Sequence, residues 1–246
     1  MHHFFVKRDN IRDQEVRFDQ TDYVHITKVL RLKADEKVSV SDGEFFYTVA
    51  LVQLMNEVTG KIVASKPVDS ESPLHTILVQ GIAKGEKMDY IIQKATELGV
   101  SEIIPVETSF CVVKLDDRKR TERAERWQKI ANEAAKQCKR GKVPKIHLPC
   151  SWRDVFSKLP NEALKLVLWE SEENTLLNQV LKLHSQKKIL VLFIGPEGGL
   201  APEEVNFAMQ NNALSVSLGK RILRTETAGM TVLAIAQYVL GDLGGA

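Results

Sequence analysis

The chain has 246 residues, of which 43% are hydrophobic, 27% charged and 7% aromatic, as in a globular protein with one large domain or two smaller ones. The net charge is only +2, which excludes a wholly basic, histone-like binder. No apolar run approaches the roughly 18 residues that span a bilayer, and the N-terminal residues lack the apolar stretch of a signal peptide. We therefore expect a cytoplasmic protein with no membrane partner.

Metal and redox chemistry are not indicated by the cysteines. Cys111, Cys138 and Cys150 are odd in number, and their spacings match no metal-binding or redox motif. We expect buried or idle thiols in a reducing compartment, and no metal site.

The first 70 residues read as a small β-rich domain. Short segments with alternating, β-branched or aromatic residues begin at Phe4, Lys37, Phe45 and Lys61. A single stretch, Thr21–Leu32, has a helical pattern. A β-domain this small must protect the exposed edges of its strands, which favours closure into a barrel. The polar residues 65–73 are interpreted as a linker.

From residue 74 to 246 strands and helices alternate, which predicts an α/β domain. The expected strands are nearly continuous apolar runs, as in a parallel sheet covered on both faces. These runs are 76–82, 101–107, 165–170, 188–195 and 213–219. Helices are expected after the first two strands, at Pro202 and near Thr225.

The positive charge is concentrated in the expected helix after the second strand. Residues 114–145 contain twelve Lys and Arg against five Asp and Glu, a local +7, so the rest of the chain carries −5. Two interpretations remain open: a solvated helix face with i,i+4 ion pairs, or a surface for nucleic-acid phosphates. The candidate phosphate contacts are Lys136, Arg140 and Lys142.

Ligands of open α/β sheets bind at the carboxyl ends of the strands. One candidate exit is 168–171, and a second is IGPEGGL, Ile194–Leu200, with three glycines and a proline. Glycine lets a backbone approach a ligand that a Cβ would exclude, although a simple strand-to-helix turn would also use it. No Walker A and no G-x-G-x-x-G motif is present in the sequence, which argues against the usual nucleotide sites.

A third exit, LGKRILRTETAG, Leu218–Gly229, interleaves Arg221 and Arg224 with apolar Ile222 and Leu223. Apolar residues could hold a flat heterocycle while the guanidinium groups meet anionic oxygens. The alternative is helix capping beside ordinary surface arginines.

These motifs together resemble the RsmE family of knotted (SPOUT) methyltransferases. The resemblance rests on five segments: IGPEGGL, LGKRILRTETAG, the helix opening KGEKMDYIIQKATELGV, the helix ERWQKIANEAAKQCKR, and HITKVLRLK near the N-terminus. It implies an α/β, trefoil-knotted parallel-sheet domain at 74–246 preceded by a PUA-like β-barrel at 1–70. Relatives often have Thr or Ser before the PEEV helix, where this chain has Ala201.

The resemblance also implies an activity: methylation of N3 of one uridine in 16S ribosomal RNA, near the decoding centre, by S-adenosylmethionine. It implies homodimers formed through the knotted domain, which the apolar final helix would suit. The residues implied in cofactor binding are Leu168, Glu170, Gly195, Pro196, Glu197, Gly198, Gly199, Leu218, Gly219, Ile222, Leu223, Thr227 and Ala228.

Methylation at N3 requires loss of a proton and stabilisation of the resulting anion. Arg224 is the candidate cation, and Glu226 is the candidate that orients Arg224 or accepts the proton, although a water could serve as the base instead. Arg31, Lys84 and Lys87 join the basic helix as candidate phosphate contacts of the 16S rRNA or small subunit. Two alternatives remain: another RNA target, such as ribose 2′-O or a tRNA base, or a non-catalytic RNA-binding protein.

Overall fold

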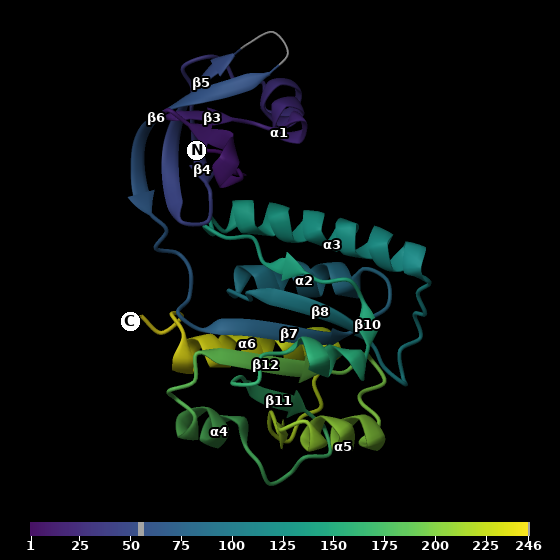
Figure 1. Cartoon of the computed structure of the whole chain (residues 1–246). Coiled ribbons are helices and arrows are strands. Elements are labelled where there is room, and N and C mark those ends of the chain that lie inside the picture. Colours follow the sequence, from purple (N-terminus) through teal and green to yellow (C-terminus); the bar gives the residue numbers. More distant parts are fainter. Residues whose placement is uncertain (54–56, 246) are drawn as a thin grey trace. The chain divides into compact units, whose positions relative to one another are not determined.

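The protein divides into two compact units in the structure, a computed structural model that describes residues 1–53 and 57–245 (Figure 1). The smaller unit comprises Met1–Glu71 with Ala135–Val143, and the larger comprises Ser72–Ala134 with Pro144–Ala246. Leu54, the last residue of the strand expected from Phe45, and Ala246, the last residue of the expected larger domain, lie outside the described residues.

The smaller unit is built on a curled, mixed sheet. Its strand order is β1-β4-β5-β6-β3-β2, with β1 parallel to β4 and the other neighbours antiparallel. Alternate side chains such as Val38 and Val40 are fully buried with Phe4 and Ile26, because successive strand residues point to opposite faces. The prediction of a small β-rich domain is confirmed. The strands are β1 (His3–Phe5), β2 (Ile11–Arg12), β3 (Glu15–Arg17), β4 (Lys37–Ser41), β5 (Phe45–Gln53) and β6 (Val58–Pro67).

The helix expected over Thr21–Leu32 is shorter and irregular. Asp19 caps α1 (Gln20–Val24) by accepting a hydrogen bond from the Asp22 amide at 2.8 Å. The chain continues as a π-helical turn, η2 (His25–Val29), and Arg31 then takes a left-handed φ of 54°. The β-branched residues here weaken a regular helix. A 3₁₀ turn, η1 (Arg8–Asn10), precedes β2.

The segment 135–143 belongs to the smaller unit, which differs from the expected division into 1–70 and 74–246. Glu71 holds it: the carboxylate accepts hydrogen bonds from the Arg140 guanidinium at 2.6 Å, the Gly141 amide at 2.9 Å and the Lys142 amide at 3.1 Å. The His3 ring also contacts the Arg140 carbonyl oxygen at 3.2 Å. Residues 65–73 are therefore not a free linker, since β6 extends to Pro67 and the Glu71 carboxylate is hydrogen-bonded to segment 135–143.

Replacing Glu71 by alanine is expected to lower the free energy of unfolding by about 3–5 kcal/mol, as for other broken buried ion pairs. The change removes a carboxylate on which a buried guanidinium and two amides depend. Urea unfolding of the full chain, followed by circular dichroism, measures the effect. Glu44→Ala breaks the exposed pair with Arg8 and should cost at most about 1 kcal/mol. Equal costs for the two variants would contradict the role of Glu71.

The larger unit is built on a parallel sheet in the order β10-β8-β7-β12-β11-β13, with β9 also paired to β8. All five expected strands are present, although β13 ends three residues before Gly219 because the chain turns into a loop. The strands are β7 (His75–Gly81), β8 (Glu102–Glu107), β9 (Lys145–Ile146), β10 (Cys150–Ser151), β11 (Leu164–Leu168), β12 (Ile189–Ile194) and β13 (Ala213–Val216).

Helices cover both faces of this sheet (Figure 1). Val167 and Phe193 belong to a core that includes Trp152 of the β10–η3 segment and Val205 of α5. The neighbouring residues Leu166 and Leu192 point to the opposite face, over which α2 and α6 pack. The helices are α2 (Lys87–Glu97), α3 (Asp117–Gln137), η3 (Asp154–Lys158), α4 (Leu177–Leu183), α5 (Pro202–Gln210) and α6 (Thr225–Leu240).

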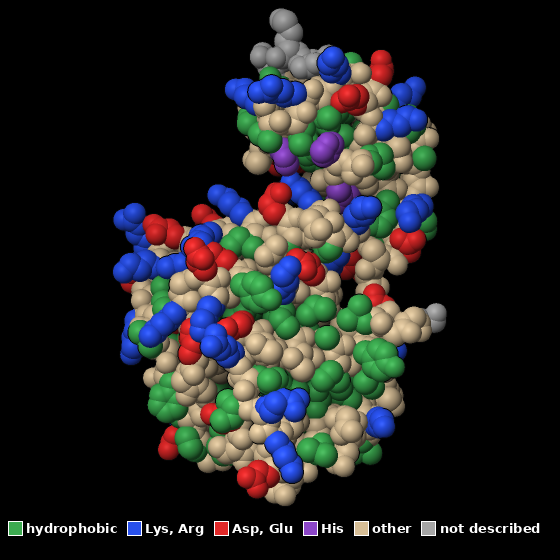
Figure 2. Space-filling view, turned by 180° about the vertical axis from the view of Figure 1, so that it is seen from behind, with side chains coloured by type: hydrophobic (Ala, Val, Ile, Leu, Met, Phe, Trp, Pro, Cys, Tyr) green, Lys and Arg blue, Asp and Glu red, His purple; other side chains and the backbone are tan. Residues whose placement is uncertain are grey.

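Figure 2 views the larger unit from the side of α2 and α6, where hydrophobic side chains gather on the surface. Tyr238 and Val239 near the end of α6 are 70% and 38% exposed, and Leu243 beyond it is 51% exposed. These are large apolar side chains on one helix end, a feature typical of interaction surfaces. In the described part of the chain, no helix is long and apolar enough to cross a membrane.

Candidate functional site

The three expected exits lie side by side at one edge of the sheet. Strand β11 lies between β12 and β13, and Leu168 is in register with Ile194 of the first and Val216 of the second. Because all three strands are parallel, the loops that follow them, 169–176, 195–201 and 217–224, leave the sheet at the same end. The structure thus brings together the segments that sequence reasoning selected.

Hydrogen bonds join these loops to one another. The Ser217 amide donates to the Thr175 carbonyl oxygen at 2.8 Å, and the Trp169 amide donates to the Val216 carbonyl oxygen at 3.3 Å. The Thr225 hydroxyl, in the first turn of α6, donates to the Gly195 carbonyl oxygen at 2.6 Å. Through these bonds the end of β13 and the start of α6 hold the other two loops in place.

Gln80 lies beneath this junction and was not among the predicted residues. Its side chain is fully buried at the end of β7, and its amide donates to the Thr225 hydroxyl at 2.9 Å and to the Gly81 carbonyl oxygen at 3.0 Å. A buried polar residue inside an apolar strand run was the signal that could have found it.

The glycines of the 195–201 loop are required by contacts within the protein. A Cβ at Gly195 would lie 2.7 Å from the backbone of Gly199, and one at Gly198 would lie 2.8 Å from Phe110 Cβ. Gly199 has a left-handed φ of 75°, and a Cβ there would lie 2.5 Å from the Glu170 carboxylate. The loop is therefore tightly folded, with Gly195 buried and Gly198 exposed at the surface.

Glu204 anchors the far end of the glycine loop. This buried carboxylate accepts hydrogen bonds from the Ala201 amide at 2.9 Å and from the Ser109 amide at 2.8 Å. Ala201 supplies no side-chain cap to α5, but Glu204 satisfies its backbone in the manner of a capping box. The contact also ties the loop after β8 to the loop after β12.

The surface around the exits suits an adenosyl group. Leu223 offers a half-buried apolar side chain, Leu168 is buried at the end of β11, and Glu170 offers an exposed carboxylate that can accept hydrogen bonds from ribose hydroxyls. Gly219 has a φ of 104° and borders open space, which leaves backbone accessible beside Leu218. Ile222 is an apolar side chain that is 85% exposed, so a bound ligand could bury it. The residues present thus fit S-adenosylmethionine.

A lysine and two carboxylates meet beside the glycine loop. Lys87 Nζ lies 3.2 Å from Glu197 Oε1 and 3.8 Å from Glu226 Oε2. Burial acts to raise the pKa of Glu197, but hydrogen bonds from its own amide, from the Lys84 amide and from Lys87 outweigh it, so the pKa lies below its ordinary value. Lys87 was expected to contact RNA, but in the structure its ammonium group is paired with Glu197 and Glu226.

The two candidate catalytic residues, Arg224 and Glu226, do not pair with each other. Arg224 is exposed and precedes the first turn of α6 without a side-chain capping bond. Within the described residues, Glu226 pairs with Lys87 rather than with Arg224, and its Oε2 atom is buried with no hydrogen-bond partner. An orienting contact from Glu226 to Arg224 is therefore not observed.

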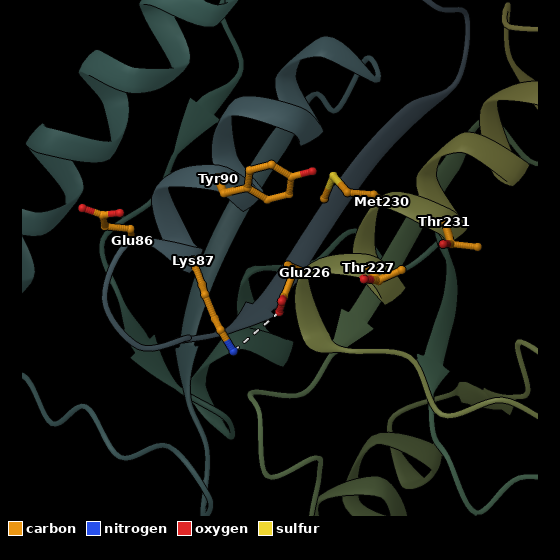
Figure 3. A pocket seen from close by; sticks show the side chains of 7 residues that line it. All are labelled: Glu86, Lys87, Tyr90, Glu226, Thr227, Met230 and Thr231. Atoms are coloured by element: carbon orange, nitrogen blue, oxygen red, sulfur yellow. Dashed lines mark ion pairs between the residues drawn. The ribbon is translucent and has the colours of Figure 1, made fainter.

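A pocket of about 540 Å³ opens between the starts of α2 and α6 (Figure 3). Thr227, expected to bind cofactor, lines this pocket, and the next residue, Ala228, is partly exposed. Sequence reasoning missed Tyr90, whose ring stands over the same pocket beside Met230 (Figure 3). The lining residues are Glu86, Lys87, Tyr90, Glu226, Thr227, Met230 and Thr231.

The expected phosphate contacts differ in their surroundings. Arg31, Lys84 and Lys142 are exposed. Lys136 is largely buried, 3.7 Å from Asp22 and over the Phe4 ring. Arg140 is 8% exposed and paired with Glu71, so it holds segment 135–143 in the smaller unit, and its expected phosphate contact stays a prediction.

Comparisons with known proteins decide the family. Residues 70–237 match the family model of the RNA methyltransferase domain. The ribosomal RNA small subunit methyltransferase E of Bacillus subtilis is 31% identical over 220 residues, covering 87% of this chain and 86% of that protein. The enzyme of the same name from Mesomycoplasma hyopneumoniae is 32% identical and covers 95% of this chain and 97% of its own length. The chain belongs to the ribosomal RNA small subunit methyltransferase E (RsmE) family.

Solved structures agree in fold with this family. The crystal structure of ribosomal RNA small subunit methyltransferase E from Neisseria gonorrhoeae bound to S-adenosylmethionine has a TM-score of 0.88 and 32% identity, covering 98% of this chain and 99% of that one. A methyltransferase from Legionella pneumophila with bound S-adenosylmethionine has a TM-score of 0.87 and 32% identity, covering 98% of each chain. The prediction of a SPOUT-type RsmE fold behind a PUA-like domain is confirmed.

Proposed function

We propose that this protein transfers a methyl group from S-adenosylmethionine to N3 of a specific uridine in 16S ribosomal RNA. The observation that carries the proposal is the fit of the whole chain, at a TM-score of 0.88, to an RsmE enzyme that binds S-adenosylmethionine. The hydrogen-bonded exits of β11, β12 and β13 support it as a cofactor site. Because ribosomal RNA is its substrate, the protein acts in the cytoplasm.

The cofactor-binding residues come from the three exits. The backbone of Leu168, Gly195, Leu218 and Leu223 would hold the adenosine, and Glu170 would accept a hydrogen bond from the ribose. S-adenosylmethionine supplies an electrophilic methyl group on a positively charged sulfur. The rigid glycine loop, fastened by Thr225 and Gln80, would offer the cofactor a fixed backbone surface at its glycines. The remaining cofactor contacts are Pro196, Glu197, Gly198, Gly199, Gly219, Ile222, Thr227 and Ala228.

Arg224 and Glu226 perform the chemistry on the base. The N3 atom of uridine carries a proton at neutral pH, and Glu226 accepts it. Glu226 Oε2 supports this role, because it accepts no hydrogen bond among the described residues, although Lys87 Nζ lies 3.8 Å away. Arg224 then stabilises the anion that spreads over O2, N3 and O4. The Arg224 side chain is exposed and makes no capping hydrogen bond to α6, so the guanidinium can contact a substrate.

Arg31, Lys84 and Lys142 contact phosphates of the substrate RNA. Replacing Lys84 or Lys142 by alanine is expected to lower the slope of log Kd against log salt by about one each. Binding of a 16S rRNA fragment at several salt concentrations measures the slope. Lys182→Ala, exposed on α4, is the control and should leave the slope unchanged. Slopes that match wild type in all three variants would contradict these contacts.

The exposed end of α6 is the contact surface of a homodimer. Tyr238, Val239 and Leu243 are apolar and exposed there, which supports burial against a second copy. Tyr238→Glu is expected to shift the sedimentation velocity from that of a dimer to that of a monomer, because a charge would be buried. A wild-type protein that sediments as a monomer would rule the dimer out.

A direct assay tests the activity. Purified protein is mixed with labelled S-adenosylmethionine and small subunits or 16S rRNA from cells that lack the protein, and the modified nucleoside is identified by mass spectrometry. We expect 3-methyluridine. Ribose-methylated nucleosides, or labelling of tRNA instead, would favour another RNA target. Binding of RNA without S-adenosylmethionine binding, tested by calorimetry, would indicate a non-catalytic protein.

A further inference from the structure

The pocket between α2 and α6 borders the glycine loop on one side. Lys87, in its wall, contacts Glu197 of that loop at 3.2 Å. Glu226, also in its wall, follows Thr225, whose hydroxyl donates to the Gly195 carbonyl oxygen. The pocket is therefore next to the proposed cofactor site and belongs entirely to the larger unit. Its volume of about 540 Å³ lies in the range typical of small-molecule sites, about 300–1,000 Å³.

One wall of the pocket has an acceptor without a donor. Glu226 Oε2 is shielded from solvent and has no hydrogen-bond partner among the described residues. The nearest cation, Lys87 Nζ, lies at 3.8 Å, which is too long for a hydrogen bond. Native proteins seldom leave a buried carboxylate oxygen without a hydrogen bond, so Glu226 is suited to turn this oxygen toward a donor that enters the pocket.

The opposite wall is aromatic and apolar. Tyr90 is 49% exposed, and in Figure 3 its ring lies beside Met230, across the pocket from the Lys87–Glu226 pair. A flat ring between these walls would stack on Tyr90 and present its edge to the two charges. A Thr227 hydroxyl, which can donate or accept, lies on the same rim.

We propose that this pocket receives the uracil ring of the substrate and that Lys87, Glu226 and Tyr90 select it. The uracil edge carries a donor, N3–H, between two carbonyl acceptors, O2 and O4. Glu226 accepts from N3–H, Lys87 donates to the neighbouring carbonyl, and Tyr90 stacks on the ring. Cytosine lacks the N3 proton, so the carboxylate would meet an acceptor instead. The inference rests on the proposed function and assigns its base specificity.

Tyrosine fluorine NMR tests the pocket directly. The chain contains four tyrosines, so protein made with 3-fluorotyrosine gives four signals, and Tyr90→Phe identifies the one from Tyr90. In titrations with uridine, cytidine and 3-methyluridine, the Tyr90 signal should shift at a uridine concentration at least tenfold lower than the concentration that either of the other two nucleosides requires. The exposed Tyr238 on α6 is the internal control.

Two outcomes of this titration overturn the proposal. The first is a Tyr90 signal that ignores uridine or responds equally to the three nucleosides. The second is a signal that moves on protein dilution but not with uridine, which would assign the pocket to subunit contact. Either result leaves N3 methylation of ribosomal RNA untouched, since that activity is read from the RNA itself.

Variants of Lys87 separate base recognition from structure. Lys87→Met should weaken uridine binding at least tenfold, whereas Lys87→Arg keeps the charge and should restore most of it. Lys94→Met, on the same helix, also breaks an ion pair, with Glu97, and should bind uridine like wild type. Calorimetry with S-adenosylmethionine and a melting curve accompany each variant. Equal uridine affinities in Lys87→Met and Lys94→Met, with both folded, would overturn the role of Lys87.

Discussion

Replacing Arg224 by alanine is expected to slow methyl transfer by about 100- to 1,000-fold, the usual effect of removing one group that stabilises a developing anion. The affinity for S-adenosylmethionine should change little, because Arg224 is exposed and makes no side-chain capping bond to α6. Single-turnover transfer to 16S rRNA measures the first quantity and calorimetry the second.

Arg221→Ala is the matched control for this prediction. Arg221 lies in the same loop and is also exposed, so its loss removes an equal charge from the same region. We expect it to weaken RNA binding slightly and to leave the transfer rate of bound RNA within about threefold of wild type, since long-range charge effects are screened by salt. Undiminished turnover in Arg224→Ala would end its assignment as the stabilising cation.

Replacing Gly195 by alanine is expected to abolish measurable binding of S-adenosylmethionine. The new Cβ would lie 2.7 Å from the Gly199 backbone, where no flexible side chain can move aside. The loop must therefore open, which displaces the Thr225 hydroxyl from the Gly195 carbonyl oxygen. Strain of this kind costs about 1–3 kcal/mol, so we also expect a lower melting temperature.

Gly85→Ala separates loss of the loop from general backbone strain. Gly85 also has a left-handed φ, 58°, but a Cβ there would meet no atom within 4 Å. The variant should lose about 1–2 kcal/mol of stability and keep its affinity for S-adenosylmethionine. If Gly195→Ala bound the cofactor as tightly as Gly85→Ala, the tight packing of the loop would not matter for binding.

The outline of the site could be predicted from local sequence because parallel strands place their ends together. Apolar runs located β11, β12 and β13. A glycine motif followed β12, and an arginine motif followed β13. No periodicity could show that Ser217 would bond to Thr175, or that Thr225 would reach Gly195, because these contacts depend on how the chain is threaded.

Charge alone was a poor guide to the role of individual basic residues. Arg140 and Lys142 stand two positions apart in the same basic cluster, yet the first is buried against Glu71 and the second is exposed. Lys87 likewise pairs with Glu197, more than a hundred residues away in the chain. Sequence shows how many charges a segment carries, whereas partners distant in the chain determine which of them remain available.

Mapping 3-methyluridine in 16S ribosomal RNA tests the central claim most directly. The RNA is compared by mass spectrometry between cells with the protein, cells without it, and cells in which Arg224→Ala replaces it. We predict one 3-methyluridine that disappears without the protein, returns with wild type and does not return with Arg224→Ala. A 3-methyluridine that persists at full level in cells without the protein would contradict the proposed function.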